Sequence, residues 1–401
     1  MTGEAGPLDR RIVISALGAA QILAWGTSFY FPAVFATAIV ADTGWSLSWV
    51  VSGTSLGLLV AGLISPQVGR IIDTHGGRPV LFASSLFYAA GLAGAGLAPN
   101  LPLYLLAWAV VGLGMGTGLY DAVFAALGRL YGSGARGPIT NLTLFGGFAS
   151  TVCWPLSAFM IDHAGWRVAC LIYAALHLFI VLPLQMAVVR QAPRVAPAAT
   201  EETQRPAAPA RIENETTIFA LLAVMLSISA AIGAIVIVNF MIFLQARGVD
   251  YAVAVSLGTM FGPAQVGARV VERLFGNRYH PIWTMVASCS LMAIGLILLL
   301  GNVPLLVLTI LIYGGGYGIS WIGRGTLPLA LFGPERFPRL MGKLAFPSLI
   351  LQAVAPSAGA WLIEARGADV TIAVLTVLAL INVVLIGILW ASCRARITAG
   401  A

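Results

Sequence analysis

Long apolar stretches alternate with short polar loops along the whole chain. A helix that crosses a bilayer needs about 20 mainly apolar residues, because the hydrocarbon core is roughly 30 Å thick and each residue advances the helix by about 1.5 Å. Twelve stretches are long enough. They span, approximately, residues 12–38, 46–70, 78–98, 102–131, 138–162, 167–188, 215–246, 252–273, 281–301, 304–331, 340–364 and 370–393. The pattern predicts an all-α integral membrane protein with 12 transmembrane helices.

The composition agrees with this prediction and excludes other classes of protein. Of 401 residues, 59% are hydrophobic and only 9% are charged, against roughly 25% charged in a soluble domain, and the mean hydropathy is +0.93. Too few polar side chains exist for a water-facing surface, and no HExxH, GxSxG or phosphate-binding loop occurs where it could act, so we expect no enzyme. The cysteines lie far apart in apolar runs, and we expect them to be buried, with no metal or cofactor. They are Cys153, Cys170, Cys289 and Cys393.

Arginine and lysine concentrate in alternate loops. One set of loops carries nearly all of them, whereas the other set carries only Arg167, Arg247 and Arg366. Since positively charged short loops stay in the cytoplasm, both termini are expected to be cytoplasmic, in the inner membrane of a bacterium. The net charge of +7 follows from this bias. The lipid bilayer is therefore the expected partner of the basic residues, and no nucleic acid is expected.

The chain divides into two similar halves. A segment rich in Pro, Ala and charge follows the sixth span, and its composition favours a flexible linker. We expect a cytoplasmic N-terminus (1–11), a six-helix bundle (12–188), a cytoplasmic linker (189–214), a second six-helix bundle (215–393) and a cytoplasmic tail (394–401). The halves resemble each other after a shift of about 200 residues. Such a repeat is typical of a transporter with its substrate site between two bundles.

The loop after the second span carries a recognisable motif. Residues 69–79 read GRIIDTHGGRP, with Gly69 and Asp73 at the spacing G, three residues, D, followed by glycine and Arg78. This motif resembles the loop signature of the major facilitator superfamily, although Thr74 stands where that signature has a basic residue. Span count, linker position and repeat extend the resemblance over nearly the whole chain. It implies two six-helix bundles, an expected monomer, and a central cavity lined by helices 1, 4, 7 and 10.

The same loop suggests a gate. Asp73 follows the partially negative C-terminal end of helix 2, where a carboxylate needs a cation, and Arg70 or Arg78 could supply it. The resemblance implies that such a cluster holds the cytoplasmic side closed. The repeat extends this expectation to the second half. The candidate gating residues are Gly69, Arg70, Asp73, Arg78, Arg269, Glu272 and Arg278. The alternative is that these charges only anchor helix ends at the lipid headgroups.

Two ionisable residues fall deep inside predicted spans, Asp121 in helix 4 and Arg324 in helix 10. Ionisable groups at this depth are costly and are functional candidates by default. The glycines around them align the two helices, so the opposite charges occupy nearly equivalent places in the two halves. Arg324 could bind an anion through its planar guanidinium. Asp121 could bind the coupling proton, because a buried carboxylate takes up a proton more readily when no cation is near. The alternatives are a permanent ion pair, or two charges each satisfied within its own bundle.

Amphipathic residues accompany these charges on the expected cavity helices. The candidates for contact with a substrate, besides Arg324, are Tyr30, Tyr120, Asn239, Tyr317 and Trp321. Each could equally serve ordinary packing. His177, in the sixth span, is expected to be structural.

The segment that leads from Tyr30 into the loop at 42–46 is similar to bacterial members of the monocarboxylate and oxalate/formate branch. That branch has cations at mid-membrane in helices 8 and 11, whereas Arg269 and Lys343 are expected near the cytoplasmic ends of their spans. The leading hypothesis is a proton-coupled secondary transporter of a small organic anion that works by alternating access. A proton-driven multidrug or metabolite exporter is the alternative. A receptor or scaffold, the third possibility, would not need two gate clusters.

Overall fold

The computed structural model describes residues 9–189 and 214–399, and within these ranges the chain forms helices and no strand. Most of the expected linker and of the expected N-terminal tail lies outside the described residues, whereas residues 394–399 of the expected C-terminal tail continue the last helix. In chain order the elements are α1 (Arg10–Gly26), α2 (Pro32–Thr43), α3 (Leu47–His75), α4 (Gly77–Leu97), α5 (Leu101–Gly118), α6 (Tyr120–Tyr131), η1 (Gly132–Ala135), α7 (Arg136–Gly147), α8 (Ala149–Leu176), η2 (His177–Val181), α9 (Leu182–Val188), α10 (Glu215–Ala246), α11 (Tyr251–Thr259), α12 (Phe261–Phe275), η3 (Gly276–Arg278), α13 (Pro281–Leu300), α14 (Leu306–Phe332), α15 (Phe337–Arg366) and α16 (Ala368–Ala399).

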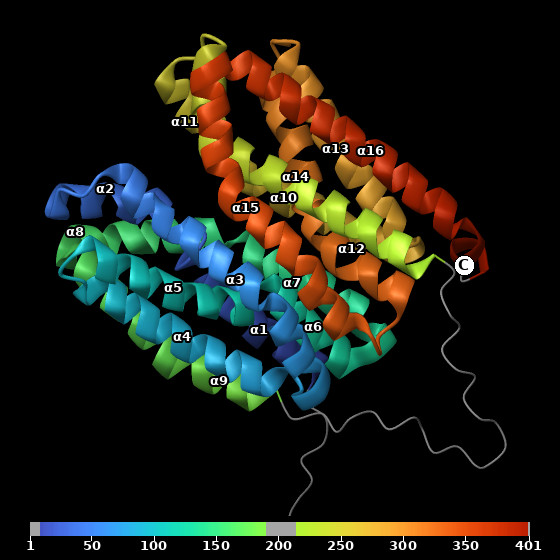
Figure 1. Cartoon of the computed structure of the whole chain (residues 1–401), viewed down its shortest axis with the longest axis horizontal. Coiled ribbons are helices and arrows are strands. Elements are labelled where there is room, and N and C mark those ends of the chain that lie inside the picture. Colours follow the sequence, from blue (N-terminus) through green and yellow to red (C-terminus); the bar gives the residue numbers. More distant parts are fainter. Residues whose placement is uncertain (1–8, 190–213, 400–401) are drawn as a thin grey trace, which may run out of the picture.

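These elements make the 12 transmembrane helices expected from the sequence. Eight stretches are long and apolar enough to cross a membrane as continuous helices, and the longest of them, Leu101–Val188, contains three spans. The first and eighth spans are each divided, into α1 and α2 and into α11 and α12. Elements α1 to α9 form the N-terminal bundle and α10 to α16 form the C-terminal bundle (Figure 1).

Several spans break near their middle, and the sequence explains where. The first span breaks after Gly26, because the hydroxyls of Thr27 and Ser28 bond back to the carbonyls of Leu23 and Ala24 and Pro32 starts a new helix. The fourth span breaks at Leu119, whose backbone is extended. A divided helix exposes backbone groups inside the membrane, which is tolerated where protein surrounds the break.

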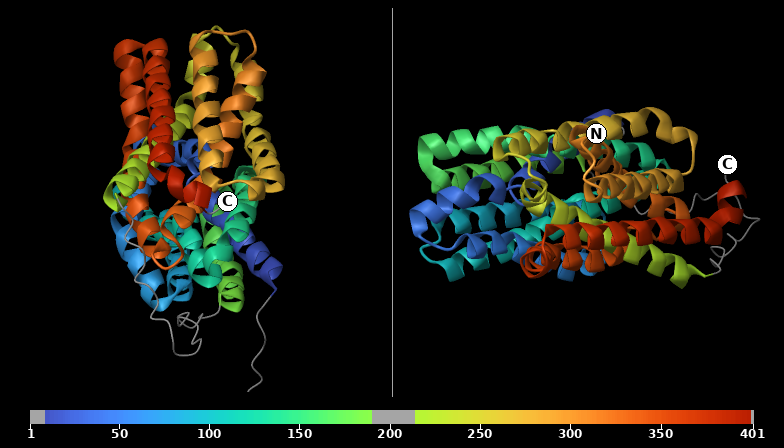
Figure 2. Two further views of the ribbon diagram at one scale, coloured as in Figure 1. Left: turned by 90° about the vertical axis from the view of Figure 1, so that its right-hand side faces the viewer. Right: turned by 90° about the horizontal axis from the view of Figure 1, so that it is seen from above.

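The two bundles touch at one end and diverge at the other (Figures 1 and 2). We call the side where α1 begins and α16 ends the terminal side, and the opposite side the far side. On the terminal side α3 packs against α15, where the Ser65 hydroxyl donates to the Gly342 carbonyl at 2.9 Å. A Cβ on Gly69 would lie 2.6 Å from the Pro338 carbonyl oxygen, so only glycine permits this approach. On the far side α2 and α8 lie apart from α11 and the far end of α15 (Figure 1).

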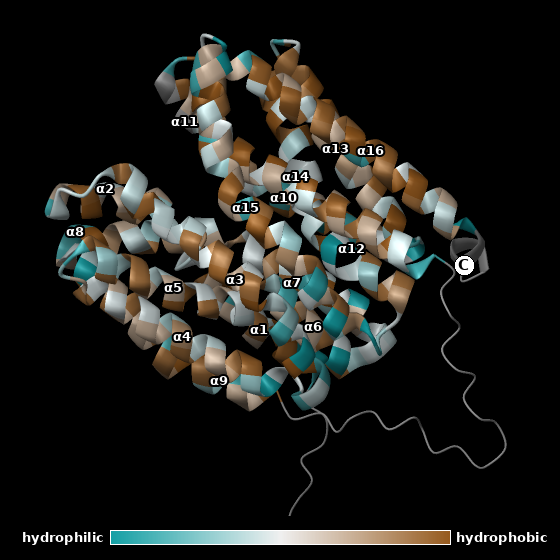
Figure 3. Cartoon of the chain, viewed as in Figure 1, coloured by the Kyte–Doolittle hydropathy of each residue, from teal (hydrophilic) through white to brown (hydrophobic). Residues whose placement is uncertain are grey.

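The outer surface of the bundles is apolar (Figure 3). Large side chains such as Leu97, Phe179 and Trp361 are more than half exposed. An exposed apolar belt of this kind is the surface that a bilayer covers. The four cysteines are buried and free.

Candidate substrate and proton site

Asp121 and Arg324 form an ion pair between the two bundles. Asp121 lies in the first turn of α6, directly after the break in the fourth span, and Arg324 lies on α14. Arg324 Nε donates to Asp121 Oδ1 at 2.7 Å and Nη2 donates to Oδ2 at 2.9 Å. The Arg324 side chain is only 6% exposed and the Asp121 side chain 16% exposed. Both charges therefore face protein and each other, and neither points outward into lipid.

Further groups stabilise the pair. The remaining guanidinium nitrogen, Nη1, donates to the hydroxyl of Ser348 on α15 at 2.7 Å, and the guanidinium lies 5.6 Å from the ring centroid of Trp321. Asp121 occupies the N-terminal turn of α6, where unpaired backbone N–H groups carry partial positive charge. The carboxylate is thus held by a cation and by a helix end. Ser348 was not a candidate from the sequence, because a serine in an apolar helix carries no signal of its own.

Three aromatic rings pack together next to the pair. The centroid of Trp25 lies 5.0 Å from that of Tyr120 and 5.3 Å from that of Trp321, and the Tyr120 and Trp321 centroids are 5.5 Å apart. Gln21 positions Trp25, because it accepts from the indole N–H and donates to the Gly118 carbonyl freed at the break in the fourth span. We call Trp25, Tyr120 and Trp321 the aromatic layer. It lies beside the ion pair, with Trp321 5.6 Å from the Arg324 guanidinium.

Arg269 is a second buried guanidinium between the bundles. It is 3% exposed, and its donors bond to the carbonyl of Gly318 at 2.9 Å, the carbonyl of Thr143 at 2.6 Å and the side chain of Gln265 at 3.3 Å. No carboxylate among the described residues forms an ion pair with it. Within the part of the chain that the structure describes, its hydrogen bonds go to neutral oxygen atoms.

Arg269 lies in the C-terminal half of α12, but its guanidinium extends away from that helix end. Its guanidinium reaches Gly318, near the middle of α14, and Thr143 on the other bundle. Side chains on an α-helix lean toward the helix N-terminus, and α12 begins toward the far side, so the long side chain extends toward mid-membrane. Lys343 is exposed near the start of α15, as expected.

The other candidate residues divide into two groups. Tyr30 packs near Trp25 and Trp154, and Tyr317 packs near Trp321, so both extend the aromatic layer. Asn239 is buried but donates to the Ile235 carbonyl of its own helix. His177 shares a hydrogen bond with the Thr27 hydroxyl through Nε2 and stacks on Tyr88, within the N-terminal bundle.

At the terminal side, Asp73 joins the two bundles. Its Oδ2 lies 2.5 Å from Nε of Arg339 on α15, and Arg129 donates to its backbone carbonyl. The sequence suggested Arg70 or Arg78 as the partner of Asp73, but neither forms an ion pair among the described residues. The cation comes from the opposite bundle.

The matching cluster of the second half is arranged differently. Glu272 accepts from Tyr279 and Thr284 at 2.6 Å each and stays within its own bundle. Arg136, from the N-terminal bundle, donates to the backbone carbonyls of Gly276 and Tyr279.

Two more arginines complete the contacts around this second cluster. Arg273 donates to Asn141 across the bundles at 2.5 Å. Arg278 lies 5.7 Å from the ring centroid of Phe275. The repeat could have pointed to the crossing arginines, because Arg136 and Arg339 lie within a few residues of corresponding places in the two halves.

Two six-helix bundles related by a repeat, with buried charges where they meet, define a secondary transporter. The model of the Major Facilitator Superfamily matches residues 17–280. The chain belongs to the major facilitator superfamily.

Curated relatives match only part of the chain. The niacin transporter NiaP of Acinetobacter baylyi is 30% identical over 145 residues, which are 35% of this chain and 31% of that protein. An uncharacterized 38 kDa protein in the 23S RNA operon of Thermoproteus tenax is 31% identical over 137 residues, 34% of this chain and 35% of that protein. The chain thus spans about one third of the length of each of these relatives.

Solved structures match nearly the whole chain. The human organic anion transporter MFSD10 (TETRAN) and a bacterial homologue of the iron transporter ferroportin, in an outward-facing state, each have a TM-score of 0.74 at 13% identity, covering 94% of this chain and 99% of theirs. The proton:xylose symporter XylE has a TM-score of 0.68 at 12% identity, covering 94% of both chains. At these identities the likeness shows the fold alone.

Proposed function

We propose that this protein is a proton-coupled carrier of a small, monocarboxylate-like organic anion. The observation that supports the proposal best is the set of charges buried between the bundles: two guanidinium groups, of Arg324 and Arg269, against one carboxylate, of Asp121. This excess of positive charge in a low-dielectric setting favours an anion, and a guanidinium matches the geometry of a carboxylate.

Arg269 and Arg324 would have different roles in binding the anion. Arg269 bonds only to neutral oxygens, so an incoming carboxylate would replace neutral acceptors by a charge and strengthen the bonding. Arg324 already bonds to a carboxylate and to Ser348. An anion reaching Arg324 would therefore compete with Asp121.

That competition supplies the coupling. Asp121 is stable as a buried anion while Arg324 holds it, and once an anion occupies Arg324 the Asp121 carboxylate loses its cation and takes up a proton. Anion and proton then bind together, and they leave together when the ion pair forms again. The bundles could separate on the terminal side only after the cross-bundle pairs at Asp121 and Asp73 have opened.

The aromatic layer supports an anion that carries a ring. Trp321 lies beside the Arg324 guanidinium, and Trp25 and Tyr120 pack against Trp321. The partial match to a niacin transporter points the same way, because niacin is an aromatic monocarboxylate. Nicotinate is therefore the first substrate to test. The alternative is a proton-driven exporter of drugs or metabolites, in which the same rings would hold apolar compounds.

We also propose how the chain is oriented in the membrane. We place the arginine-rich loops, and with them both termini, in the cytoplasm of a bacterial inner membrane. The terminal side, where the bundles meet, is then the cytoplasmic side, and the conformation described faces outward. The protein would work as a monomer, because the site is built within one chain.

The experiment is uptake by purified protein in proteoliposomes, with labelled nicotinate, lactate and oxalate and with a cationic dye, each with and without an imposed pH gradient. We expect one or more of the anions to accumulate when the outside is acidic, and the dye to be excluded. Accumulation of the dye without any anion would favour the exporter and overturn the anion proposal.

A further inference from the structure

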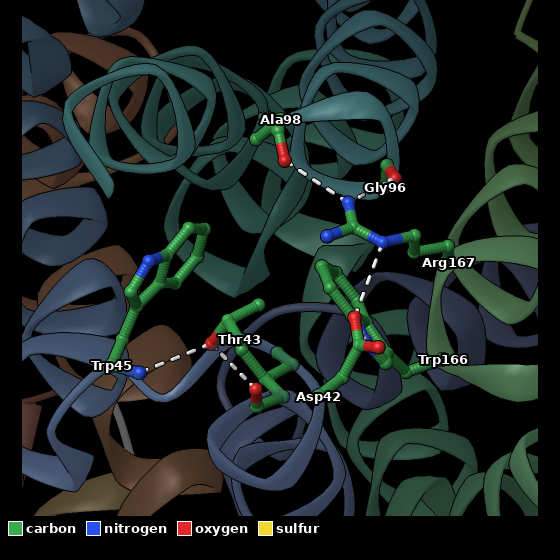
Figure 4. Close-up of polar contacts among 8 residues, drawn as sticks. Asp42, Thr43, Trp45, Gly96, Ala98, Trp166 and Arg167 are labelled. Carbon is green, nitrogen blue, oxygen red and sulfur yellow. Dashed lines mark hydrogen bonds and ion pairs between the residues drawn. The ribbon is translucent and has the colours of Figure 1, made fainter. Parts of the chain in front are cut away.

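Each bundle carries an ion pair at its far end, and the two pairs have reversed charges. In the N-terminal bundle Asp42, in the last turn of α2, lies 3.3 Å from Nε of Arg167, and Arg167 also donates to the carbonyls of Gly96 at 3.2 Å and Ala98 at 3.0 Å at the end of α4 (Figure 4). The indole N–H of Trp166 donates to the same Asp42 oxygen at 3.0 Å. We call this group the N clasp.

The C-terminal bundle has a matching C clasp. Arg247, directly after α10, lies 3.1 Å from Asp369 in the first turn of α16 and donates to the Leu300 carbonyl at the end of α13 at 3.3 Å. Each clasp joins the end of the first span of its bundle to the end of the third span and the start of the sixth. Arg167 and Asp369 correspond in the repeat, because each follows a left-handed glycine, Gly165 or Gly367, by two residues. The left-handed glycines Gly44 and Gly248 at the ends of the first spans likewise place Asp42 within one residue of the counterpart of Arg247. The places are nearly equivalent and the charges are exchanged.

The reversal makes the clasps unequal in strength. Arg247 follows the C-terminal end of α10 and Asp369 begins α16, so both charges have the sign that the neighbouring helix end stabilises. Asp42 ends α2, and Arg167 starts the sixth span after the kink at Gly165, so both have the opposite sign. The Asp42 and Arg167 side chains are 51% and 42% exposed, whereas in the C clasp Arg247 is 10% exposed and Asp369 is 71% exposed. Because its charges oppose the helix ends and its arginine is the more exposed one, the N clasp is the weaker of the two.

Equivalent positions in two bundles related by a pseudo-two-fold axis approach each other when the bundles rock together at that end. At the terminal side the closed contact already uses a pair that crosses the bundles, Asp73 with Arg339. At the far side the bundles diverge in this structure (Figure 1). If Asp42 and Arg247 had the same charge, closure of the far side would bring like charges together. Because their charges are opposite, closure brings an anion to a cation.

We propose that Asp42 exchanges Arg167 for Arg247 and that the Asp42–Arg247 pair holds the far side closed in the opposite conformation of the transport cycle. After the exchange Arg167 still donates to the Gly96 and Ala98 carbonyls, so its guanidinium remains hydrogen-bonded. Arg247 likewise keeps the Leu300 carbonyl after the exchange, and its Nε has no hydrogen-bond partner among the described residues. The proposal depends on alternating access and is independent of what the substrate is.

Two single variants test the exchange, because they break the same clasp and are expected to act in opposite directions. Arg167→Asp removes the present partner of Asp42 and leaves its attraction to Arg247, so the far side should close more often. Asp42→Arg places two cations opposite each other, so the far side should close less often. We expect about a two- to fivefold change in the ratio of closed to open molecules in each direction, as for a partly exposed ion pair.

The readout is electron–electron distance measurement in nanodiscs, with spin labels at exposed Pro99 and Asn302 in far-side loops of the two bundles. The buried native cysteines permit specific labelling. The double variant Asp42→Arg/Arg247→Asp restores opposite charges and should recover the closed population. Asp42→Asn, a milder change, should shift it in the direction of Asp42→Arg by a smaller factor. If Arg167→Asp and Asp42→Arg shift the population in the same direction, or the double variant stays open, the clasps are merely structural and the proposal fails.

Discussion

Arg324 holds Asp121 through two parallel hydrogen bonds, 2.7 and 2.9 Å long, that join a helix of one bundle to a helix of the other. The pair is buried and has further support from Ser348. A buried ion pair costs desolvation of both charges, so breaking it on one side alone leaves an uncompensated charge. Substitution of Arg324 alone is therefore expected to destabilise the protein more than substitution of both residues.

Arg324→Gln should destabilise the protein by about 3–5 kcal/mol, because it leaves Asp121 buried without its cation. Asp121→Asn/Arg324→Gln should recover most of the loss, since neither charge remains. The measurement is the thermal unfolding midpoint in detergent. If the double variant were as unstable as Arg324→Gln, the loss of stability would not come from an unpaired Asp121 carboxylate.

Gly69→Ala should prevent the close contact of α3 with α15. The new Cβ would lie 2.6 Å from the Pro338 carbonyl oxygen and 3.0 Å from the Cα of Gly342, so the helices must separate. We expect the terminal side to open and the distance between spin labels at Pro99 and Asn302 to shorten. Gly267→Ala is the matched control, because Gly267 is the repeat counterpart of Gly69 and has no atom within 4 Å of its Cβ position. Equal effects of the two substitutions would contradict the contact's role as a gate.

Arg269→Gln should weaken binding of the anion while leaving the Asp121–Arg324 pair intact. The amide of glutamine can still bond to neutral acceptors such as the Gly318 and Thr143 carbonyls but cannot attract a carboxylate as an ion. We expect at least a tenfold rise in the concentration of anion needed for half-maximal counterflow, about 1.4 kcal/mol, and a smaller rise for Arg269→Lys. Unchanged counterflow in Arg269→Gln would remove Arg269 from the site.

Protonation of His280 is expected to make the stability of the protein depend on pH. Its Nδ1 accepts from the backbone N–H of Ile282 at the start of α13, and its pKa is lowered by burial and, to a smaller extent, by the charge of Arg136. The folded state therefore binds fewer protons than the unfolded state. The contribution of this cap, about 1 kcal/mol, is fully present above the unfolded pKa of roughly 6.5 and is lost as pH falls through the folded pKa.

His280→Asn separates this titration from the cap itself, because an asparagine side chain caps a helix without titrating. Between pH 7.5 and pH 4.5 the unfolding midpoint of the wild type should fall further than that of His280→Asn. Parallel pH profiles of the two proteins would show that His280 does not contribute in this way.

The fold could be predicted from the sequence because bilayer thickness fixes the length of a spanning helix and the chain repeats itself. The glycines that align their helices indicated that Asp121 and Arg324 occupy nearly equivalent places in the two halves, but they left open whether the two side chains pair. The direction of the Arg269 side chain was not predicted, because depth was judged from its place along the helix and not from the lean of the side chain toward the helix N-terminus. Arg339 was missed as the partner of Asp73 because pairing was sought within one loop, whereas the gate joins two bundles.

In the proposed mechanism, Asp121 takes up a proton when an anion displaces it from Arg324. The direct measurement is the internal pH of proteoliposomes, followed with an enclosed dye, after addition of the transported anion without an imposed gradient. The account predicts that the interior acidifies with the wild type and that Asp121→Asn still exchanges labelled anion but moves no protons. Acidification by Asp121→Asn equal to that of the wild type, or anion uptake by the wild type without any acidification, would contradict it.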